Sequence, residues 1–146
     1  LFELAQAHGL EPGGIFRYAE VEESPENGIE TGQRMAEAVL RWPERPTALI
    51  ARDDQVALGA LQALREAGVE VPRQMSVTGF DNIDLARRLH PTLTTIDQNP
   101  QGLMERAGEL LLEQIALPKS RRGAAVAEAV DPELVVGEST GPARRG

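Results

Sequence analysis

The chain has 146 residues, of which 41% are hydrophobic and 26% are charged, a composition typical of a folded globular domain. Its formal net charge of −8 argues against direct binding to a phosphate backbone, which needs clustered Lys and Arg. The absence of cysteine excludes disulfides, thiolate catalysis and cysteine-ligated zinc, and the short apolar runs predict no membrane span.

Hydrophobic periodicity and turn residues divide the chain into alternating helices and strands. In chain order we predict a helix at 1–8, a strand at 14–21, a helix at 29–40, a strand at 47–51, a helix at 54–67, a strand at 75–80, a short helix at 83–89, a strand at 92–96, a helix at 100–116 and a strand at 134–136. The uniformly apolar strand at 47–51 is expected to be buried on both faces. This alternation predicts an open, mostly parallel α/β sheet with helices on both faces.

Two of the predicted strands end in polar, acidic clusters. Asp53 and Asp54 follow the strand at 47–51, and Asp81 and Asn82 follow the next strand. Because ligands in open α/β sheets bind beyond the carboxyl ends of the strands, we expect Asp53 and Asp81 to face one crevice. Their carboxylates can accept hydrogen bonds from the hydroxyls of a small polar ligand. Helix capping explains Asp54 and Asn82 better than ligand contact does, whereas both interpretations stay open for Asp53 and Asp81.

Catalytic alternatives find less support in the sequence. A divalent metal site for phosphoryl transfer would need a lysine at a later strand end, and the one lysine, Lys119, lies in a loop beyond the last long helix. The two histidines, His8 and His90, have no obvious serine partner and are expected at the surface. We therefore expect no metal, no cofactor and no enzymatic activity, and an α/β hydrolase or phosphatase remains the alternative.

The segment PTALIARDDQVALGALQALREAGVEVPRQMSVTGFDNIDLARRLHPTLTTIDQ resembles the effector-domain core of LacI/GalR transcription regulators almost without gaps. That family shows, in the same order, a P-T-A strand, an N-D dipeptide, A-x-G on a helix, G-x-x-V-P, S-V-x-G-F-D-D and L-T-T-V. The closing PELVVGEST is similar to the family's last strand, although Gly137 stands where the family usually has arginine. The N-terminal third of the chain matches the family only loosely.

The resemblance implies a ligand site, residue by residue. Asp81 matches the family's effector-binding aspartate, and Asp53 stands where the family usually has a ligand-contacting asparagine, which replaces an amide with a pure acceptor. Asn27 matches an aromatic position that stacks on the ligand in several members, and Pro100 matches a further lining position. The family's ligand-binding arginine would fall before Leu1.

The implied function is the effector-sensing part of a cytoplasmic transcription repressor that binds a carbohydrate or a related small polar molecule. Operator DNA would be bound only through a head outside this chain, and no membrane contact is expected. The resemblance also implies that 1–91 and 131–140 form a C-terminal subdomain, that 92–118 crosses into an N-terminal subdomain, and that 141–146 is a tail. The alternatives are a solute-binding component of a sugar transporter on the same fold, and a sensor attached to a winged-helix head.

Two leucines are expected at a homodimer contact. The face of the helix at 54–67 that should pack on the sheet comprises Val56, Ala57, Ala60, Leu61 and Leu64. Leu58 falls on the opposite side and is expected to be exposed. The resemblance implies that this helix and the segment ending near Leu89 form a two-fold contact, which would bring Leu58 and Leu89 of each protomer to one patch.

An apolar face also runs along the predicted helix at 100–116. Its members are Leu103, Met104, Ala107, Leu110, Leu111 and Ile115. A face of this breadth needs a partner to be buried, and the resemblance implies that the N-terminal subdomain supplies it.

Overall fold

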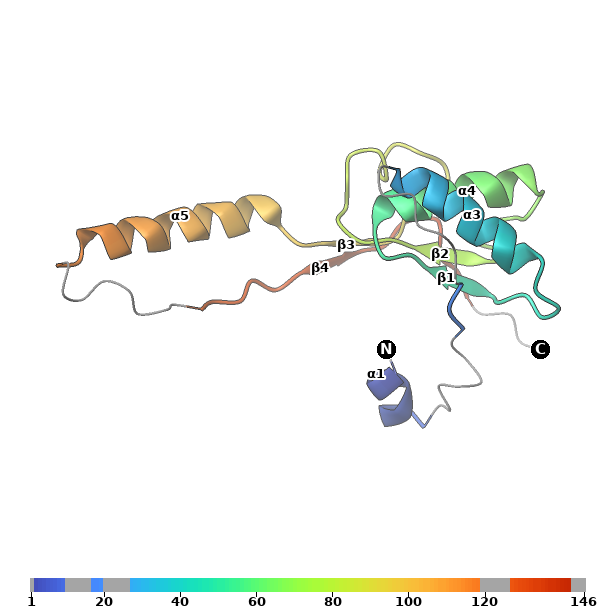
Figure 1. Ribbon diagram of the computed structural model, residues 1–146, viewed down its shortest axis with the longest axis horizontal. Helices are drawn as coiled ribbons and strands as arrows, with labels where there is room; N and C mark the ends of the chain where they lie inside the picture. Colours follow the sequence, from blue (N-terminus) through green and yellow to red (C-terminus); the bar gives the residue numbers. More distant parts are fainter. Residues whose placement is uncertain (1, 10–16, 20–26, 119–126, 143–146) are drawn as a thin grey trace.

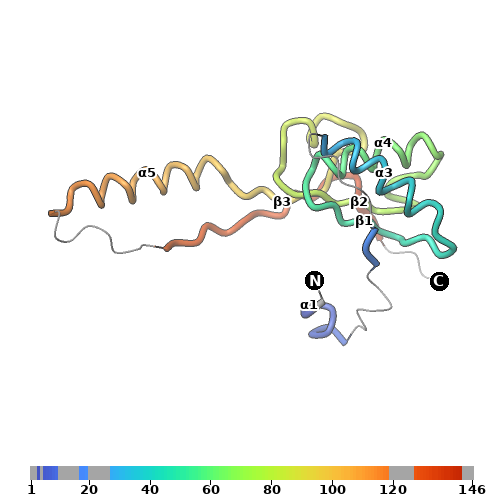
Figure 2. The backbone as a smooth tube through the Cα atoms, in the orientation of Figure 1, coloured from blue at the N-terminus to red at the C-terminus, as the bar shows by residue number. Residues whose placement is uncertain are grey.

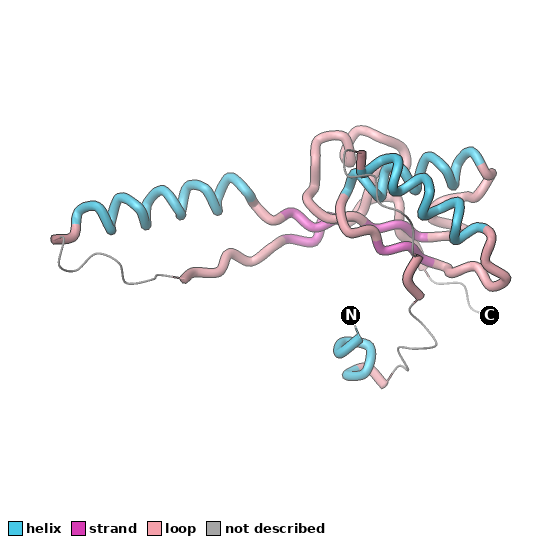
Figure 3. Tube along the Cα trace, in the orientation of Figure 1, coloured by secondary structure: helices cyan, strands magenta, loops and turns pink. Residues whose placement is uncertain are grey.

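The computed structural model describes residues 2–9, 17–19, 27–118 and 127–142. Its elements, labelled in Figure 1, are α1 (Phe2–Ala7), α3 (Gly28–Leu40), β1 (Ala48–Ile50), α4 (Asp54–Glu66), β2 (Ser76–Thr78), β3 (Thr95–Asp97), α5 (Pro100–Ala116) and β4 (Glu133–Val135). The path of the chain and its division into helices, strands and loops can be followed in Figures 2 and 3. The predicted strand at 14–21 lies mostly outside the described residues, and 17–19 have no regular structure.

The sheet is parallel where it carries the site. β1 and β2 pair in parallel, and a parallel bridge between Thr78 and Thr94 adds the segment that precedes β3. α4 forms the helical crossover that a parallel pair requires. β3 then pairs antiparallel with β4, with Ile96 opposite Leu134. This arrangement agrees with the open, mostly parallel α/β sheet predicted from the sequence.

Helices α3 and α4 lie side by side with closely approaching backbones (Figure 1). A Cβ atom at Gly32 would overlap the carbonyl of Val56, and one at Gly59 would overlap the carbonyl of Ile29. Glycine is the residue that permits such an approach, since it has no side chain. The A-x-G pattern of the sequence therefore has a packing reason: Ala57 is fully buried and Gly59 forms the helix crossing.

The hydrophobic core lies between these two helices and the sheet. Leu64 of α4 and Val77 of β2 are fully buried, and Trp42 packs at the edge of the core. The other buried apolar members are Ala36, Val39, Leu49, Ala51, Val56, Ala57, Ala60, Ala63, Met75, Ala86 and Leu93. The prediction that β1 is buried on both faces is wrong. Leu49 belongs to the hydrophobic core, whereas Ile50 on the other face is 55% exposed.

The predicted short helix at 83–89 is a series of turns. The amide of Ala86 donates to the Ile83 carbonyl and that of Arg88 to the Leu85 carbonyl, so each bond spans three residues rather than four. The carbonyl of Ala86 accepts from the amide of Leu93 and is not used to continue a helix. Anchoring of the segment at both ends therefore prevents a regular α-helix.

Helix α5 extends away from α3, α4, β1 and β2 (Figure 1), and none of its 17 residues is buried. Its most exposed large apolar side chains are Met104, Leu111, Leu112 and Ile115, between 54% and 73% exposed. Within the described chain, the apolar face predicted for this helix is uncovered.

Candidate functional site

The carboxyl ends of the three parallel segments meet at one edge of the sheet. The amide of Asp54, after β1, donates to the Phe80 carbonyl over 2.8 Å, and the amide of Asp81, after β2, donates to the Ile96 carbonyl over 2.9 Å. The Asp81 side chain also meets the residue that follows β3, because its Oδ1 accepts from Gln98 Nε2 at 2.6 Å. The two acidic clusters predicted from the sequence therefore lie at the same edge.

The backbone at this edge adopts an unusual conformation for residues other than glycine. Asp81 has φ of +109°, Asn82 has φ of +53° and Asn99 has φ of +49°. Such conformations raise the energy of L-residues, and they tend to occur where surrounding contacts hold a functional side chain in place. Within the described chain, all non-glycine residues with positive φ follow β2 or β3, at this edge of the sheet.

The two aspartates at the start of α4 have different roles, and the cap is Asp53. Asp53 has an extended backbone and caps α4, since its Oδ1 accepts from the Val56 amide at 2.8 Å. Its Oδ2 accepts from Arg52 Nε at 3.0 Å. The prediction that Asp54 is the cap is wrong, because Asp54 is the first helical residue and its side chain is completely buried.

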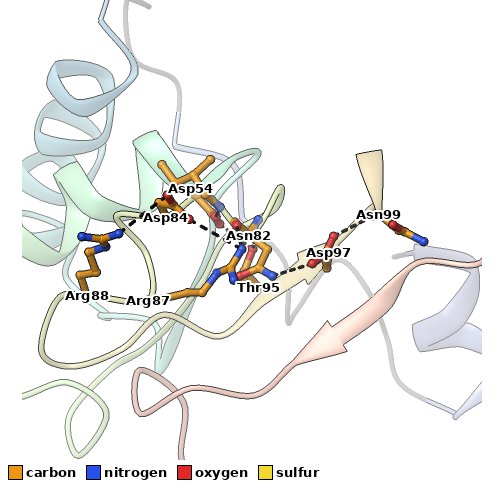
Figure 4. A network of polar contacts seen from close by, with 9 residues as sticks. Asp54, Asn82, Asp84, Arg87, Arg88, Thr95, Asp97 and Asn99 are labelled. Atoms are coloured by element: carbon orange, nitrogen blue, oxygen red, sulfur yellow. Dashed lines mark hydrogen bonds and ion pairs between the residues drawn. The ribbon is translucent and has the colours of Figure 1, made fainter. Parts of the chain in front are cut away.

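The Asp54 carboxylate joins elements that are distant in the sequence (Figure 4). Its Oδ1 accepts from Thr95 Oγ1 at 2.6 Å, and its Oδ2 accepts from the Ile83 amide at 2.8 Å. The Thr95 hydroxyl in turn accepts from the Asn82 amide at 3.3 Å. These bonds connect the start of α4, the turn after β2 and strand β3.

Asn82 does not cap a helix either, contrary to prediction. Its Nδ2 donates to Asp97 Oδ2 at 2.7 Å, and its carbonyl accepts from Arg87 Nη2 at 3.1 Å. Its Oδ1 is buried and has no hydrogen-bond partner among the described residues. The bond from Asn82, together with one from the Asn99 amide, holds the pKa of Asp97 below its ordinary value because both favour the carboxylate form.

Two further residues expected to line the site have structural roles. Asn27 caps α3, with its Oδ1 accepting from the amides of Ile29 and Glu30. Pro100 is the first residue of α5, a position at which proline is tolerated. These roles neither require nor exclude ligand contact, so Asn27 and Pro100 remain predictions, as do Asp53 and Asp81.

A separate cavity of about 690 Å³ lies between α4, the loop at 68–73 and the turns at 85–91. Leu58, Leu85 and Leu89 line it, whereas Asp53 and Asp81 do not. Leu58 is only 5% exposed, so the prediction that it is an exposed leucine is wrong: it lines this cavity together with Leu85 and Leu89. None of the residues predicted to bind ligand lines this cavity.

No three His, Asp or Glu side chains converge as a metal site would require within the described ranges. Among the helices that the structure describes, none combines the length and the hydrophobicity needed to cross a bilayer.

Sequence reasoning missed three residues of β3 and its end, Thr95, Asp97 and Gln98, which bond to the side chains of Asp54, Asn82 and Asp81, respectively. The signal for them was the position of the strand at 92–96 in the parallel sheet, because its carboxyl end must reach the same edge as those of β1 and β2.

Comparisons with known proteins agree with this architecture. Residues 1–140 match the periplasmic binding protein-like domain, and the chain belongs to that family. It is 41% identical over 115 residues to the HTH-type transcriptional repressor PurR of Mannheimia succiniciproducens, an alignment that covers 79% of this chain and 32% of the relative. PurR of Escherichia coli is 43% identical over 86 residues, which cover 59% of this chain and 25% of the relative.

The fold of the chain is also similar to solved structures of transcription regulators. A putative transcriptional regulator of the LacI family from Sanguibacter keddieii superposes with a TM-score of 0.74 at 31% identity, covering 96% of this chain and 50% of that one. A LacI family regulator from Enterococcus faecium has a TM-score of 0.80 at 24% identity, covering 97% and 49%, and shows the shared fold. The predicted fold class and the resemblance to LacI/GalR regulators are confirmed. The chain spans about a third of the length of the curated relatives it matches.

Proposed function

We propose that this chain is the effector-sensing part of a DNA-binding transcription repressor that acts in the cytoplasm. Similarity to proteins named as transcriptional repressors supports this role. The effector is a small polar molecule, a sugar or a related compound, bound at the carboxyl ends of β1, β2 and β3. Operator DNA is contacted by a part of the regulator outside this chain.

The observation that carries the proposal is the Asp81 carboxylate. It is exposed at the strand ends, on a backbone with φ of +109°, and one of its oxygens accepts from Gln98. The other oxygen, Oδ2, has no hydrogen-bond partner in the described part of the chain. A charged acceptor held in a strained turn is suited to bind the hydroxyl or N–H donors of a ligand.

Calorimetry on the intact regulator tests this site with ribose, glucose, adenine and guanine as ligands. One of these compounds should bind to the wild-type regulator. Replacing Asp81 with Ala should weaken its binding free energy by about 1.5–3 kcal/mol, the size of a lost hydrogen bond to a charged group. Asp84→Ala is the control, because Asp84 is three residues away with a side chain 82% exposed. Equal affinities in the two variants would remove Asp81 from the site.

The segment 92–118 is proposed to cross into a second subdomain, completed by chain outside the 146 residues. The lack of any fully buried residue in α5 supports this assignment, since an apolar face is normally covered in the intact protein. The segments 1–91 and 131–140 then form the C-terminal subdomain, and 141–146 its tail.

Homodimerisation is proposed to use the patch around Leu58 and Leu89. Leu89 is 40% exposed and Leu85 beside it is 45% exposed, whereas Leu58 forms the buried floor of the same cavity. Aspartate at Leu58 would disturb the fold, so the contact is tested by Leu85→Asp with Leu89→Asp. Sedimentation should then report a monomer with ligand affinity retained, and a variant that still sediments as a dimer places the contact elsewhere.

A further inference from the structure

Asp54 is a completely buried carboxylate that contacts no proposed ligand position directly. Burial of a charged group is unfavourable unless hydrogen bonds compensate for the lost water. Its two oxygens each accept a short bond, from Thr95 Oγ1 and from the Ile83 amide. The arrangement therefore needs an explanation beyond helix formation, since Asp53 already caps α4.

The neighbouring backbone is built around this carboxylate. A Cβ atom at position 79 would overlap Asp54 Oδ1 and would lie 2.8 Å from Leu93 Cδ2. Gly79 is the glycine of the G-F-D motif, and its lack of a side chain provides the space that the carboxylate occupies. The motif thus combines the exposed Asp81 with the glycine that admits the buried Asp54.

Both amides that follow Asp81 are bound by the same pair of side chains. The Asn82 amide donates to Thr95 Oγ1, and the Ile83 amide donates to Asp54 Oδ2. Because Asp81 and Asn82 have left-handed backbones, the turn stays in this conformation only if its surroundings hold it there. Asp54 and Thr95 supply that restraint immediately after the ligand-binding position.

We propose that Asp54 and Thr95 are positioning residues that fix the Asp81 carboxylate at the strand ends and tie it to β3. The proposal rests on the proposed function, because it assigns these residues to the Asp81 site. Since β3 leads through Asn99 into α5, a displacement of β3 would displace the turn that carries Asp81. Ligand bound at Asp81 is thereby linked to the segment that crosses out of this part of the regulator.

Amide-resolved hydrogen exchange on the intact, ligand-free regulator tests the restraint. Thr95→Val keeps the shape of this buried side chain and removes its hydroxyl, whereas Thr95→Ser keeps the hydroxyl. In Thr95→Val the amides of Asn82 and Ile83 should exchange about tenfold faster, while the Ala51 amide, which donates to the Thr78 carbonyl, should keep its wild-type rate. Thr95→Ser should preserve wild-type rates at all three amides.

The control is Thr78→Val in β2. The Thr78 hydroxyl makes no hydrogen bond within the described residues, so this replacement should leave the exchange rates of the Asn82 and Ile83 amides unchanged. Equal exchange in Thr95→Val and Thr95→Ser overturns the proposal. So does uniform acceleration that includes Ala51, since that result indicates general destabilisation. Exchange needs no ligand, so it decides the restraint even where the proposed function fails.

Affinity provides the second readout. The ligand is whichever of ribose, glucose, adenine and guanine binds to the wild-type protein. Thr95→Val should lower the affinity for this ligand about tenfold, and Thr95→Ser should leave it unchanged. Unchanged affinity in Thr95→Val, with faster exchange at Asn82 and Ile83, overturns the link between the restraint and the ligand.

Discussion

Helices α4 and α5 are both amphipathic, yet the apolar face of α4 is buried in this chain and that of α5 is exposed. α4 has eight buried residues among its 13, whereas α5 has none among its 17. α4 packs against α3 and β2, and α5 extends away from them (Figure 1). The difference shows that an apolar face predicts the need for a partner without indicating where the partner lies in the sequence.

The largest contrast is expected from two leucine-to-alanine variants of the 146-residue chain. Leu64→Ala in α4 removes a fully buried side chain and should lower the free energy of unfolding by about 2–5 kcal/mol. Leu111→Ala in α5, where the leucine is 61% exposed, should change it by less than about 0.5 kcal/mol. Urea unfolding measures both. Similar losses at the two positions would mean that α5 is packed within this chain.

The two helices also contain interior glycines in opposite surroundings. Gly59→Ala would place a Cβ atom on the Ile29 carbonyl and should destabilise the chain by about 1–3 kcal/mol. Gly108→Ala has no atom within 4 Å of the new Cβ and should stabilise α5 by about 0.5–1 kcal/mol through helix propensity alone. Thermal unfolding followed by circular dichroism distinguishes these outcomes. A destabilising Gly108→Ala would show that α5 has a close neighbour.

A smaller effect, on the pKa of one carboxyl group, is expected between the packed part of the chain that contains α4 and the extended helix α5. This carboxyl group belongs to Asp97, the last residue of β3. The side-chain bond from Asn82 and the Asn99 amide hold the pKa of Asp97 below its ordinary value of 3.8. Because the folded-state pKa is depressed, the stability from these bonds is present above that value and is lost as the pH falls through the folded pKa. Asn82→Ala should therefore raise the pKa of Asp97 in an NMR titration of its carboxyl carbon. An identical titration in wild type and variant would contradict the assigned bond.

Sequence patterns predicted the elements well where the signals are local. The bounds of α5 follow from Pro100 at its start and from uninterrupted periodicity, and the acidic strand ends followed from strand order. The errors concern long-range contacts. Asp54 is buried where it meets Thr95, 41 residues away, and Leu58 is buried in the wall of a cavity that Leu85 and Leu89 also line. No local pattern contains either partner, so neither the cap at Asp53 nor the buried Leu58 could be predicted from periodicity.

The most direct test of the account is the crystal structure of the intact regulator with the compound that calorimetry identifies. We predict that the ligand lies beyond the carboxyl ends of β1, β2 and β3, with a donor atom at hydrogen-bond distance from the Asp81 carboxylate. A ligand found instead in the cavity lined by Leu58 and Leu89, with Asp81 uncontacted, would contradict the assignment of the site.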